Sequence, residues 1–340
     1  MNSIPLIKPY LGKKAKEYVN DALDSGWVSS AGKYVQRFQD EFAKYQEKRY
    51  AIATSSGTTA LHLALIALGI REGDEVIVPT LTFCATINAV LYTGATPVLV
   101  DIDPKTWNID PDCARKAITP KTRAILAVHL YGYPVDGEIY NLGVPVIDDC
   151  AESMGCGAFG QVGCFSFYGN KIITTGEGGM VVTDDYGIYN KIQLYRDHGM
   201  NRKNKYRYDV VGYNYRMTNL QAALGCSQLE EIDDILDRRR GIGYQYRENL
   251  RPENFRHFDS RRVNWLTTIL IDNRDQVVER LSESGIETRP MFTPLHCMKI
   301  YPNSILPEAE KISKRGLSLP TFYDITEEEI KRVCGVINAA

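Results

Sequence analysis

A single lysine, Lys171, stands in the stretch GNKIITTGEGGMVV (residues 169–182), whose only other charged residue is Glu177. A lysine held among apolar groups is less stable as a cation, so its pKa falls and its free amine can act as a nucleophile. The alternative is a loop lysine whose ammonium group reaches solvent, which is the commoner environment for this residue. The residue and its setting make Lys171 a candidate nucleophile.

Two adjacent acids, Asp148 and Asp149, follow the apolar residues of VPVIDDCA (144–151). If this segment is a strand of a parallel sheet, the acids lie at its carboxyl edge, where ligands bind in open α/β sheets. Successive side chains of a strand point to opposite faces. At most one of the two acids can therefore face a ligand, and we expect the other to cap or pair; turn formation is an alternative for either.

A third feature is TSSGTTALHLAL (54–65), in which a tight turn leads directly into a predicted helix. Helix N-terminal amides, with the hydroxyls of Ser56, Thr58 and Thr59, could bind an anion. Taken alone, the N-cap of a core helix is the more ordinary interpretation. Together, an anion site, a strand-end acid and an isolated lysine match the needs of pyridoxal 5'-phosphate (PLP), namely a phosphate site, a ring-nitrogen partner and an amine.

The elements that must position these residues resemble those of a parallel α/β sheet. Seven short segments are rich in β-branched residues and bounded by Gly, Pro or Asp. They are residues 50–57, 74–80, 96–102, 123–132, 144–151, 163–169 and 178–184. Such apolar strands predict a mostly parallel sheet with helices on both faces. One of these helices should occupy GTTALHLALIALGI, where Gly69 stops it.

After Thr218 the pattern changes, and residues 218–249 predict a long helical stretch leading from a large domain towards a small one. The elements expected beyond it are a strand at 263–272, a helix at 275–286, an extended segment around 287–296 and a final helix with a capping box from Thr326 to Glu329. We therefore expect a large PLP-binding domain over residues 1–235 and a small α+β domain over residues 236–340.

The composition argues against nucleic-acid and membrane partners. The 340 residues include 40 Lys and Arg and 42 Asp and Glu, with a net charge of -2. Because the two signs are interspersed, no basic surface for nucleic acid or an anionic membrane is expected. The N-terminus lacks a basic segment followed by an apolar run, and no apolar stretch is long enough to span a membrane. These features favour a cytoplasmic protein.

The eight cysteines have no short C-x-x-C spacing, and we expect them to be reduced. Cys150, Cys156 and Cys164 could form a metal cluster. They lie at apolar or glycine-rich strand edges without a nearby histidine, however, so small buried thiols are favoured. We predict no metal site.

Four longer segments resemble a known family. FSFYGNKIITTGEGGMVVTDD, RDHGM, GYNYRMTNLQAALG and SSGTTALHLALIALGI are closely similar to the DegT/DnrJ/EryC1/StrS family of sugar aminotransferases. The resemblance extends from about residue 5 to the C-terminus. It implies an aspartate-aminotransferase-like, fold-type I PLP enzyme: an α/β fold with a mostly parallel sheet, helices on both faces and a smaller C-terminal α+β domain.

The resemblance also implies roles for individual residues. Lys171 would bond to PLP and then move the proton between the substrate carbon and the cofactor. Asp149 would hold the ring nitrogen protonated, and Glu152, where many relatives carry glutamine, would lie near the ring hydroxyl. Phe83 would stack on the ring. The residues implied at the phosphate are Gly57, Thr58 and Ser166, with Asn214 reaching it from the neighbouring subunit of a homodimer. A helix-entry role is the alternative for Asn214.

The activity implied is transamination, because related sugar 3-dehydratases carry histidine in place of Lys171. The amino donor would be L-glutamate and the acceptor a nucleotide-linked ketosugar. Segments 25–42, 96–110 and 285–301 are most similar to members that act at C4 of GDP-4-keto-6-deoxy-D-mannose. Members acting on dTDP-4-keto-6-deoxyglucose share much of this sequence, and a non-catalytic PLP-fold sensor is the alternative from another class. Candidate contacts with the sugar and base are Arg289, His296 and Tyr301, each of which could instead be structural.

Two segments depart from the family pattern. Relatives usually place a full helix before the acid-bearing strand and a hairpin after it, and here residues 133–145 and 153–163 are shorter. The shortening spares every catalytic match. It leaves open how that part of the sheet is covered.

Overall fold

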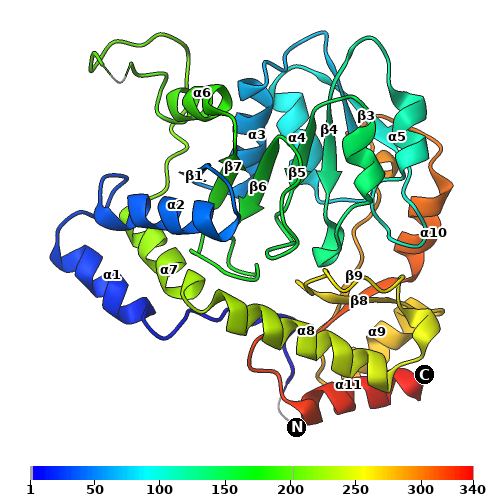
Figure 1. Cartoon of the computed structure of the whole chain (residues 1–340). Coiled ribbons are helices and arrows are strands. Elements are labelled where there is room, and N and C mark those ends of the chain that lie inside the picture. Colours follow the sequence, from blue (N-terminus) through cyan, green and yellow to red (C-terminus); the bar gives the residue numbers. More distant parts are fainter. Residues whose placement is uncertain (1–2, 202, 340) are drawn as a thin grey trace.

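The computed structural model describes residues 3–201 and 203–339, which form two sheets with their own helices (Figure 1). The seven strands of the large sheet are β1 (Tyr50–Thr54), β2 (Glu75–Pro79), β3 (Thr96–Val100), β4 (Thr122–Val128), β5 (Val146–Asp149), β6 (Val162–Ser166) and β7 (Gly179–Thr183). Each coincides with one of the seven segments expected from the sequence. The apolar, β-branched runs were therefore a sufficient signal for this sheet.

The large sheet has the strand order β1-β7-β6-β5-β4-β2-β3. β7 is antiparallel to both of its neighbours, β1 and β6, and the remaining pairs are parallel. All strands except β7 thus end at the same edge. The prediction of a mostly parallel sheet in an α/β fold is confirmed.

Helices cover both faces of this sheet (Figure 1). The helices of this part are α1 (Ala15–Asp24), α2 (Lys33–Tyr45), α3 (Gly57–Ala67), α4 (Cys84–Tyr92), α5 (Pro111–Ala117), α6 (Tyr186–Arg196) and α7 (Asn219–Leu229), of which α1 packs on α7 and not on the sheet. Ile52 packs with the core on the side of α3 and α4, whereas Ala53 packs with Phe38 and Phe42 of α2 on the other side. The alternation of side chains along a strand thus divides one sheet between two cores.

Helix α3 illustrates how the local sequence sets the boundaries of an element. Ser56 is its N-cap, and Ser56 and Thr59 form a reciprocal capping box. The helix ends before Gly69, whose φ of +84° suits a residue without a side chain. Because α3 packs against the sheet and against the helices α4 and α6, most of its residues after the first turn are apolar and buried.

The shortened segment at 133–145 forms only a 3-10 helix, η2 (Gly137–Asn141), where relatives were expected to carry a full helix. Val135 and Ile139 are nevertheless buried, and they pack against Ile125 and Ala127 of β4. Together with α5, η2 therefore covers the part of the sheet that a full helix would cover in relatives. The segment 153–163 contains no regular element until β6 begins.

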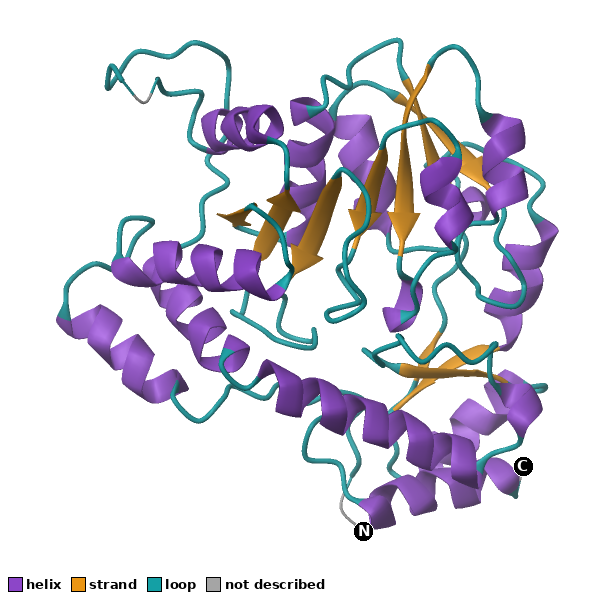
Figure 2. Ribbon diagram, in the orientation of Figure 1, coloured by secondary structure: helices purple, strands orange, loops and turns teal. Residues whose placement is uncertain are grey.

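The smaller sheet is antiparallel, in the order β8-β10-β9, and lies near both chain ends in Figure 2. The elements of this part are α8 (Ile232–Asn249), β8 (Thr267–Leu270), α9 (Arg274–Glu283), β9 (Arg289–Pro290), α10 (Pro307–Arg315), β10 (Gly316–Leu319) and α11 (Glu327–Asn338). The expected capping box from Thr326 to Glu329 opens α11.

The long helix expected over residues 218–249 is wrong in one respect, because it is interrupted between α7 and α8. The division into domains at residue 235 stays a prediction. Ile4, near the N-terminus, bridges to Ile286 and belongs to the small-sheet core, whereas Leu295 packs with the large sheet. Within the described residues, no helix is both long and apolar enough to cross a membrane.

Candidate active site

A cavity of about 510 Å³ opens at the carboxyl edge of the large sheet. Its lining includes residues that follow four different strands: Gly57 after β1, Phe83 after β2, Asp149 at the end of β5 and Ser166 at the end of β6. Strands that run in the same direction bring their carboxyl ends to one edge, where ligands of such sheets bind. The volume lies in the range of small-molecule and cofactor sites.

Lys171 lines this cavity from the turn that follows β6, and its side chain is only 13% exposed. The Nζ atom lies 3.6 Å from Oε1 of Glu152 and 3.8 Å from the centre of the Trp265 ring. Burial lowers the pKa of the Lys171 ammonium group, while the carboxylates of Glu152 and Asp149 raise it. Burial is the largest of these effects, so the structure favours an available amine.

The indole of Trp265 is itself fixed. Its Nε1 donates a hydrogen bond to the backbone oxygen of Asn170 (2.6 Å), and its ring stacks on Tyr131 at a centroid distance of 5.9 Å. The sequence analysis missed Trp265, because it treated the apolar segment 263–272 only as a strand. The available signal was an aromatic residue two positions before β8.

Asp149 is buried, and both of its carboxylate oxygens are held. Oδ2 accepts a hydrogen bond from Oγ1 of Thr86 (2.8 Å), and Oδ1 accepts one from the backbone N–H of Ala151 (3.1 Å). Burial raises the pKa of Asp149, and the two hydrogen bonds lower it. Thr86 was also missed in the sequence; it lies three residues after Phe83, in the first turn of α4.

Asp148 points to the opposite face of β5, as the alternation of a strand requires. Its Oδ1 accepts a hydrogen bond from the hydroxyl of Tyr140 (2.8 Å), and its Oδ2 accepts one from the backbone N–H of Gly160 (2.7 Å). Asp148 does not line the cavity. Its hydrogen bonds connect the two shortened segments, 133–145 and 153–163. This geometry agrees with the expectation that one of the two acids pairs within the protein while the other faces a ligand.

Glu152 lies beside Lys171 and is almost completely buried. Its Oε2 accepts a hydrogen bond from the backbone N–H of Tyr131 (2.8 Å), which fixes the carboxyl group next to the amine. Burial raises the pKa of Glu152, and the charge of Lys171 lowers it. Tyr131 has a φ of +52°, and this left-handed conformation, which only a few residues other than glycine adopt, aims its N–H at the carboxylate.

The beginning of α3 packs closely against the end of β6. A side chain at Gly57 would place its Cβ 2.7 Å from Cβ of Ser166, so only glycine fits this contact. The first in-helix hydrogen bond is donated by the amide of Ala60 to the backbone oxygen of Ser56. The amides of Gly57 and Thr58 precede it, at the positive end of the helix dipole, where an anion is stabilised.

The three-hydroxyl anion site expected from the sequence needs a correction. Oγ of Ser56 accepts a hydrogen bond from the amide of Thr59, and Oγ1 of Thr59 accepts one from the amide of Ser56. The hydroxyl of Thr59 is therefore used in capping the helix. Ser56, Gly57 and Thr58 line the cavity, and Thr59 does not.

Phe83 is the residue that precedes α4, and 53% of its surface is exposed. Its ring lies 5.9 Å from that of Phe292, which also lines the cavity. The exposed ring leaves room for a planar group to stack on it within the cavity.

Asn214 lies outside the cavity of its own chain among the residues that the structure describes. It is exposed, forms an isolated bridge with Asp197, and accepts a hydrogen bond from Nε of Arg216 (3.2 Å). In this position, Asn214 does not reach the cavity of its own chain.

Of the three candidate contacts with a sugar and base, only Arg289 lines the cavity. His296 is buried with Nδ1 2.7 Å from Oγ1 of Thr80, and Tyr301 donates a hydrogen bond to Oδ1 of Asn88 (2.9 Å). Within this chain, His296 and Tyr301 thus have the structural roles that the sequence analysis gave as the alternative.

The arrangement fits PLP. The close contact at Gly57 leaves free amides for a phosphate, Asp149 offers a carboxylate for a ring nitrogen, and Lys171 offers an amine. When bound, PLP supplies an electron sink that stabilises negative charge on a substrate carbon. The amine of Lys171 can accept and return a proton at Nζ, while Glu152 and Trp265 hold it in position.

Comparison with known proteins agrees with this chemistry. The model of the DegT/DnrJ/EryC1/StrS aminotransferase family matches residues 9–338. A GDP-perosamine synthase from Escherichia coli O157:H7 is 46% identical, with 99% of this chain and 98% of that protein covered. A GDP-perosamine synthase from Caulobacter vibrioides is 42% identical, with 99% of each covered.

Solved structures show the same fold. DesV from S. venezuelae superposes with a TM-score of 0.94 at 33% identity, covering 100% of this chain and 98% of DesV. The putative sugar aminotransferase Spr1654 from Streptococcus pneumoniae, solved in its PMP form, has a TM-score of 0.94 at 25% identity and covers 99% and 97%.

Proposed function

Because the chain belongs to the DegT/DnrJ/EryC1/StrS aminotransferase family, we propose that it is a PLP-dependent nucleotide-sugar aminotransferase. The reaction proposed is transfer of the amino group of L-glutamate to C4 of GDP-4-keto-6-deoxy-D-mannose, which gives GDP-perosamine. The names of the relatives that match nearly the whole chain support the GDP-linked acceptor. The neighbour solved in its PMP form supports the cofactor.

One observation carries the proposal: the amine of Lys171 is buried in the cavity, between the carboxyl group of Glu152 and the ring of Trp265. A non-catalytic sensor has no need for a lysine whose pKa is lowered by burial and whose amine is close enough to Asp149, at the end of β5, for that carboxylate to raise the pKa of the amine. The same amine can serve both halves of the reaction, since each requires one proton to move to or from a carbon next to the cofactor.

The positively charged Arg289 supports an anionic substrate. It lies in β9 at the cavity and is exposed, so its guanidinium group is free to meet a carboxylate or a phosphate. L-glutamate and a nucleotide sugar both carry such groups. The acceptor dTDP-4-keto-6-deoxyglucose remains the alternative, because nothing in the chemistry of Arg289 distinguishes two diphosphates.

The test separates the two half-reactions. The purified enzyme is aminated with L-glutamate, freed of donor, and mixed separately with the GDP-linked and the dTDP-linked 4-keto-6-deoxy sugars. We expect the yellow absorbance of PLP to return with the GDP-linked sugar, with an aminated product detected by mass spectrometry. Return with the dTDP-linked sugar alone would reassign the acceptor. No loss of colour with L-glutamate would overturn transamination itself.

We further propose a homodimer with shared active sites, in which Asn214 of one chain contacts the phosphate held by the other. The support is that the exposed Asn214 lies outside the cavity of its own chain, as described above, so it could reach a phosphate only in the cavity of another chain. A cytoplasmic location is also part of the proposal. The eight cysteines, all within the described residues, form no disulfides, as is usual where thiols stay reduced.

A further inference from the structure

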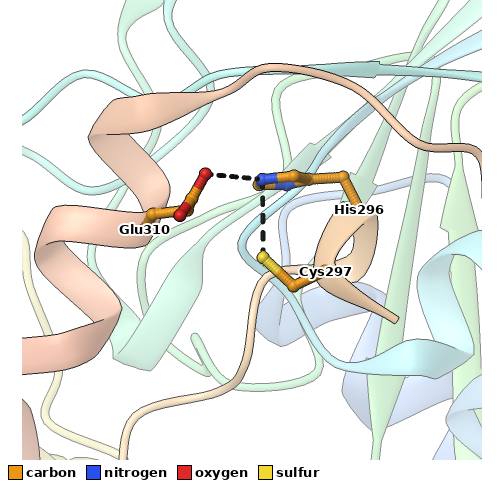
Figure 3. A group of neighbouring side chains, drawn as sticks. All are labelled: His296, Cys297 and Glu310. Atoms are coloured by element: carbon orange, nitrogen blue, oxygen red, sulfur yellow. Dashed lines mark hydrogen bonds and ion pairs between the residues drawn. The ribbon is translucent and has the colours of Figure 1, made fainter. Parts of the chain in front are cut away.

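Three side chains with metal-binding atoms meet at a place away from the cavity (Figure 3). His296 and Cys297 belong to the 3-10 helix η4 (Leu295–Cys297), and Glu310 belongs to α10. Nε2 of His296 lies 3.5 Å from Oε1 of Glu310 and 3.5 Å from Sγ of Cys297. One ligand atom from each residue lies within 4.8 Å of the other two.

These spacings are those that a tetrahedral zinc ion imposes on its ligands. With Zn–N, Zn–S and Zn–O bonds of roughly 2.05, 2.3 and 2.1 Å and tetrahedral angles, nitrogen and sulfur lie about 3.5 Å apart, and nitrogen and oxygen about 3.4 Å apart. Both values agree with the distances from Nε2 of His296. Two of the three spacings therefore already suit one ion, and the sulfur of Cys297 and the carboxylate of Glu310 lie within 4.8 Å of each other.

A hydrogen bond with Thr80 orients the ring of His296. Its Nδ1 lies 2.7 Å from Oγ1 of Thr80, and the side chain of His296 is 3% exposed. When Nδ1–H donates to this hydroxyl, the lone pair of Nε2 faces Glu310 and Cys297. Metal-binding histidines are held by such a second hydrogen bond from the other ring nitrogen. Without an ion, the neutral ring would direct the lone pair of Nε2 at the carboxylate of Glu310. A cation between the two groups would accept electron pairs from both.

The open side of the group gives an ion access to it. Cys297 is exposed, and the side chain of Glu310 is 40% exposed. Oε2 of Glu310 pairs with Nζ of Lys314 (3.7 Å), which leaves Oε1 to face His296. The fourth position of a tetrahedral ion would be open to water.

We propose that His296, Cys297 and Glu310 form a binding site for one divalent metal ion of the zinc class. A nitrogen, a sulfur and an oxygen ligand suit zinc better than magnesium or calcium, which prefer oxygen alone. A thiolate and a carboxylate together neutralise the charge of the ion. The site shares no residue with the lining of the PLP cavity, so it stands independently of the proposed reaction.

A bound ion would connect η4 and α10, and both of these elements already form hydrogen bonds with residues that follow strands of the large sheet. The amide of Leu295 donates to the backbone oxygen of Thr80, and Asp101 accepts hydrogen bonds from the amides of Glu308 and Ala309 at the start of α10. An ion bound across η4 and α10 binds only when both are in place, so it stabilises the folded protein.

The experiment uses the PLP-loaded enzyme, treated with a chelator and kept in a non-chelating reductant. Zn²⁺ is titrated against a competing indicator dye, and Co²⁺ is titrated while thiolate-to-metal absorbance is followed. We expect one ion per chain, and at least about tenfold weaker binding in Cys297→Ser and in Glu310→Gln. The matched controls are Cys113→Ser and Glu308→Gln, the second of which changes a neighbouring acid of α10 with similar exposure.

Two results would overturn the proposal. One is the absence of stoichiometric binding to the wild-type enzyme. The other is equal affinity in Cys297→Ser, Glu310→Gln and the two controls, which would mean that the ion binds elsewhere and that His296 and Glu310 are joined only by a hydrogen bond. Aminotransferase activity is not used as a readout, so failure of this site and failure of the proposed reaction are distinguishable.

Discussion

At the scale of single residues, the chemistry depends on how Lys171 is held. Burial lowers the pKa of its ammonium group, and the neighbouring carboxylates of Glu152 and Asp149 act in the opposite direction. The ring of Trp265 lies over the amine and excludes solvent from that side. The amine is thus positioned by its neighbours before any ligand arrives.

The first prediction concerns this amine. In Lys171→Ala, we expect turnover to fall by about a thousandfold or more, because no other lysine among the described residues lines the cavity. Borohydride reduction followed by mass spectrometry should no longer attach PLP to the chain. Lys331→Ala, which removes an exposed lysine of α11 with a surface ion pair, is the control and should keep wild-type activity. Retained activity in Lys171→Ala would refute the assignment.

The second prediction concerns Thr86, whose hydroxyl donates to Asp149. Thr86→Val keeps the shape of the side chain but removes its hydrogen bond to the charged carboxylate of Asp149. That carboxylate should then hold the proton on the ring nitrogen of PLP less well. We expect the half-reaction with L-glutamate to slow by roughly tenfold while PLP stays bound, measured by single-turnover absorbance. Thr93→Val, at the other end of α4, should leave the rate unchanged. Equal rates in the two variants would contradict the role.

Sequence reasoning found the residues whose chemical type is distinctive and missed those that position them. Lys171 and Asp149 stood out because charge is rare in their surroundings. Trp265 stands just before an apolar strand and Thr86 stands in a helix, and only the folded chain brings them to the amine and the carboxylate. Long-range placement of this kind leaves no local pattern.

At the scale of elements, local patterns were enough for the strands and insufficient for the break between α7 and α8. Residues 226–240 contain neither Gly nor Pro, so no helix-breaking residue marks an interruption at this point. The break occurs at Glu230 and Glu231, whose carboxylates bind distant groups: Glu231 accepts from the hydroxyl of Tyr10 (2.7 Å), and Glu230 pairs with Lys14 (3.0 Å). Tertiary contacts with the N-terminal segment therefore decide this boundary.

The third prediction concerns helix α3 and pH. His62 is buried among tyrosine rings, and burial lowers the pKa of its imidazole below the ordinary value of 6.5. Below pH 6.5 the unfolded chain therefore binds a proton that the folded chain does not, so the free energy of unfolding falls as the solution is acidified. We expect His62→Phe to flatten this loss in denaturant titrations between about pH 7.5 and about pH 5.5.

The matched control for this prediction is His257→Gln, which changes an exposed histidine in a loop. It should show the same dependence on pH as the wild type. If His62→Phe and His257→Gln lose stability in parallel on acidification, the buried imidazole of α3 is not responsible.

At the scale of the whole molecule, the cavity joins the two sheets. Gly57 reaches it from the large sheet and Arg289 from β9 of the small sheet, so relative movement of the two parts changes its shape. The surroundings of Asn214 differ: it is exposed, and the contacts described above join it to Asp197 and Arg216, neither of which lines the cavity. A role for Asn214 at a phosphate therefore requires a second chain.

The fourth prediction tests the shared site with hybrid dimers of Lys171→Ala and Asn214→Ala chains, purified through two different tags. Each homodimer should be impaired, Lys171→Ala most severely. If sites are shared, one site of the hybrid loses both residues and the other keeps both, so activity recovers to about half that of the wild type. If Asn214 acts in its own chain, no site is intact, and the hybrid shows about half the activity of the Asn214→Ala homodimer. An Asn214→Ala homodimer with full activity and unchanged PLP affinity would remove Asn214 from the site altogether.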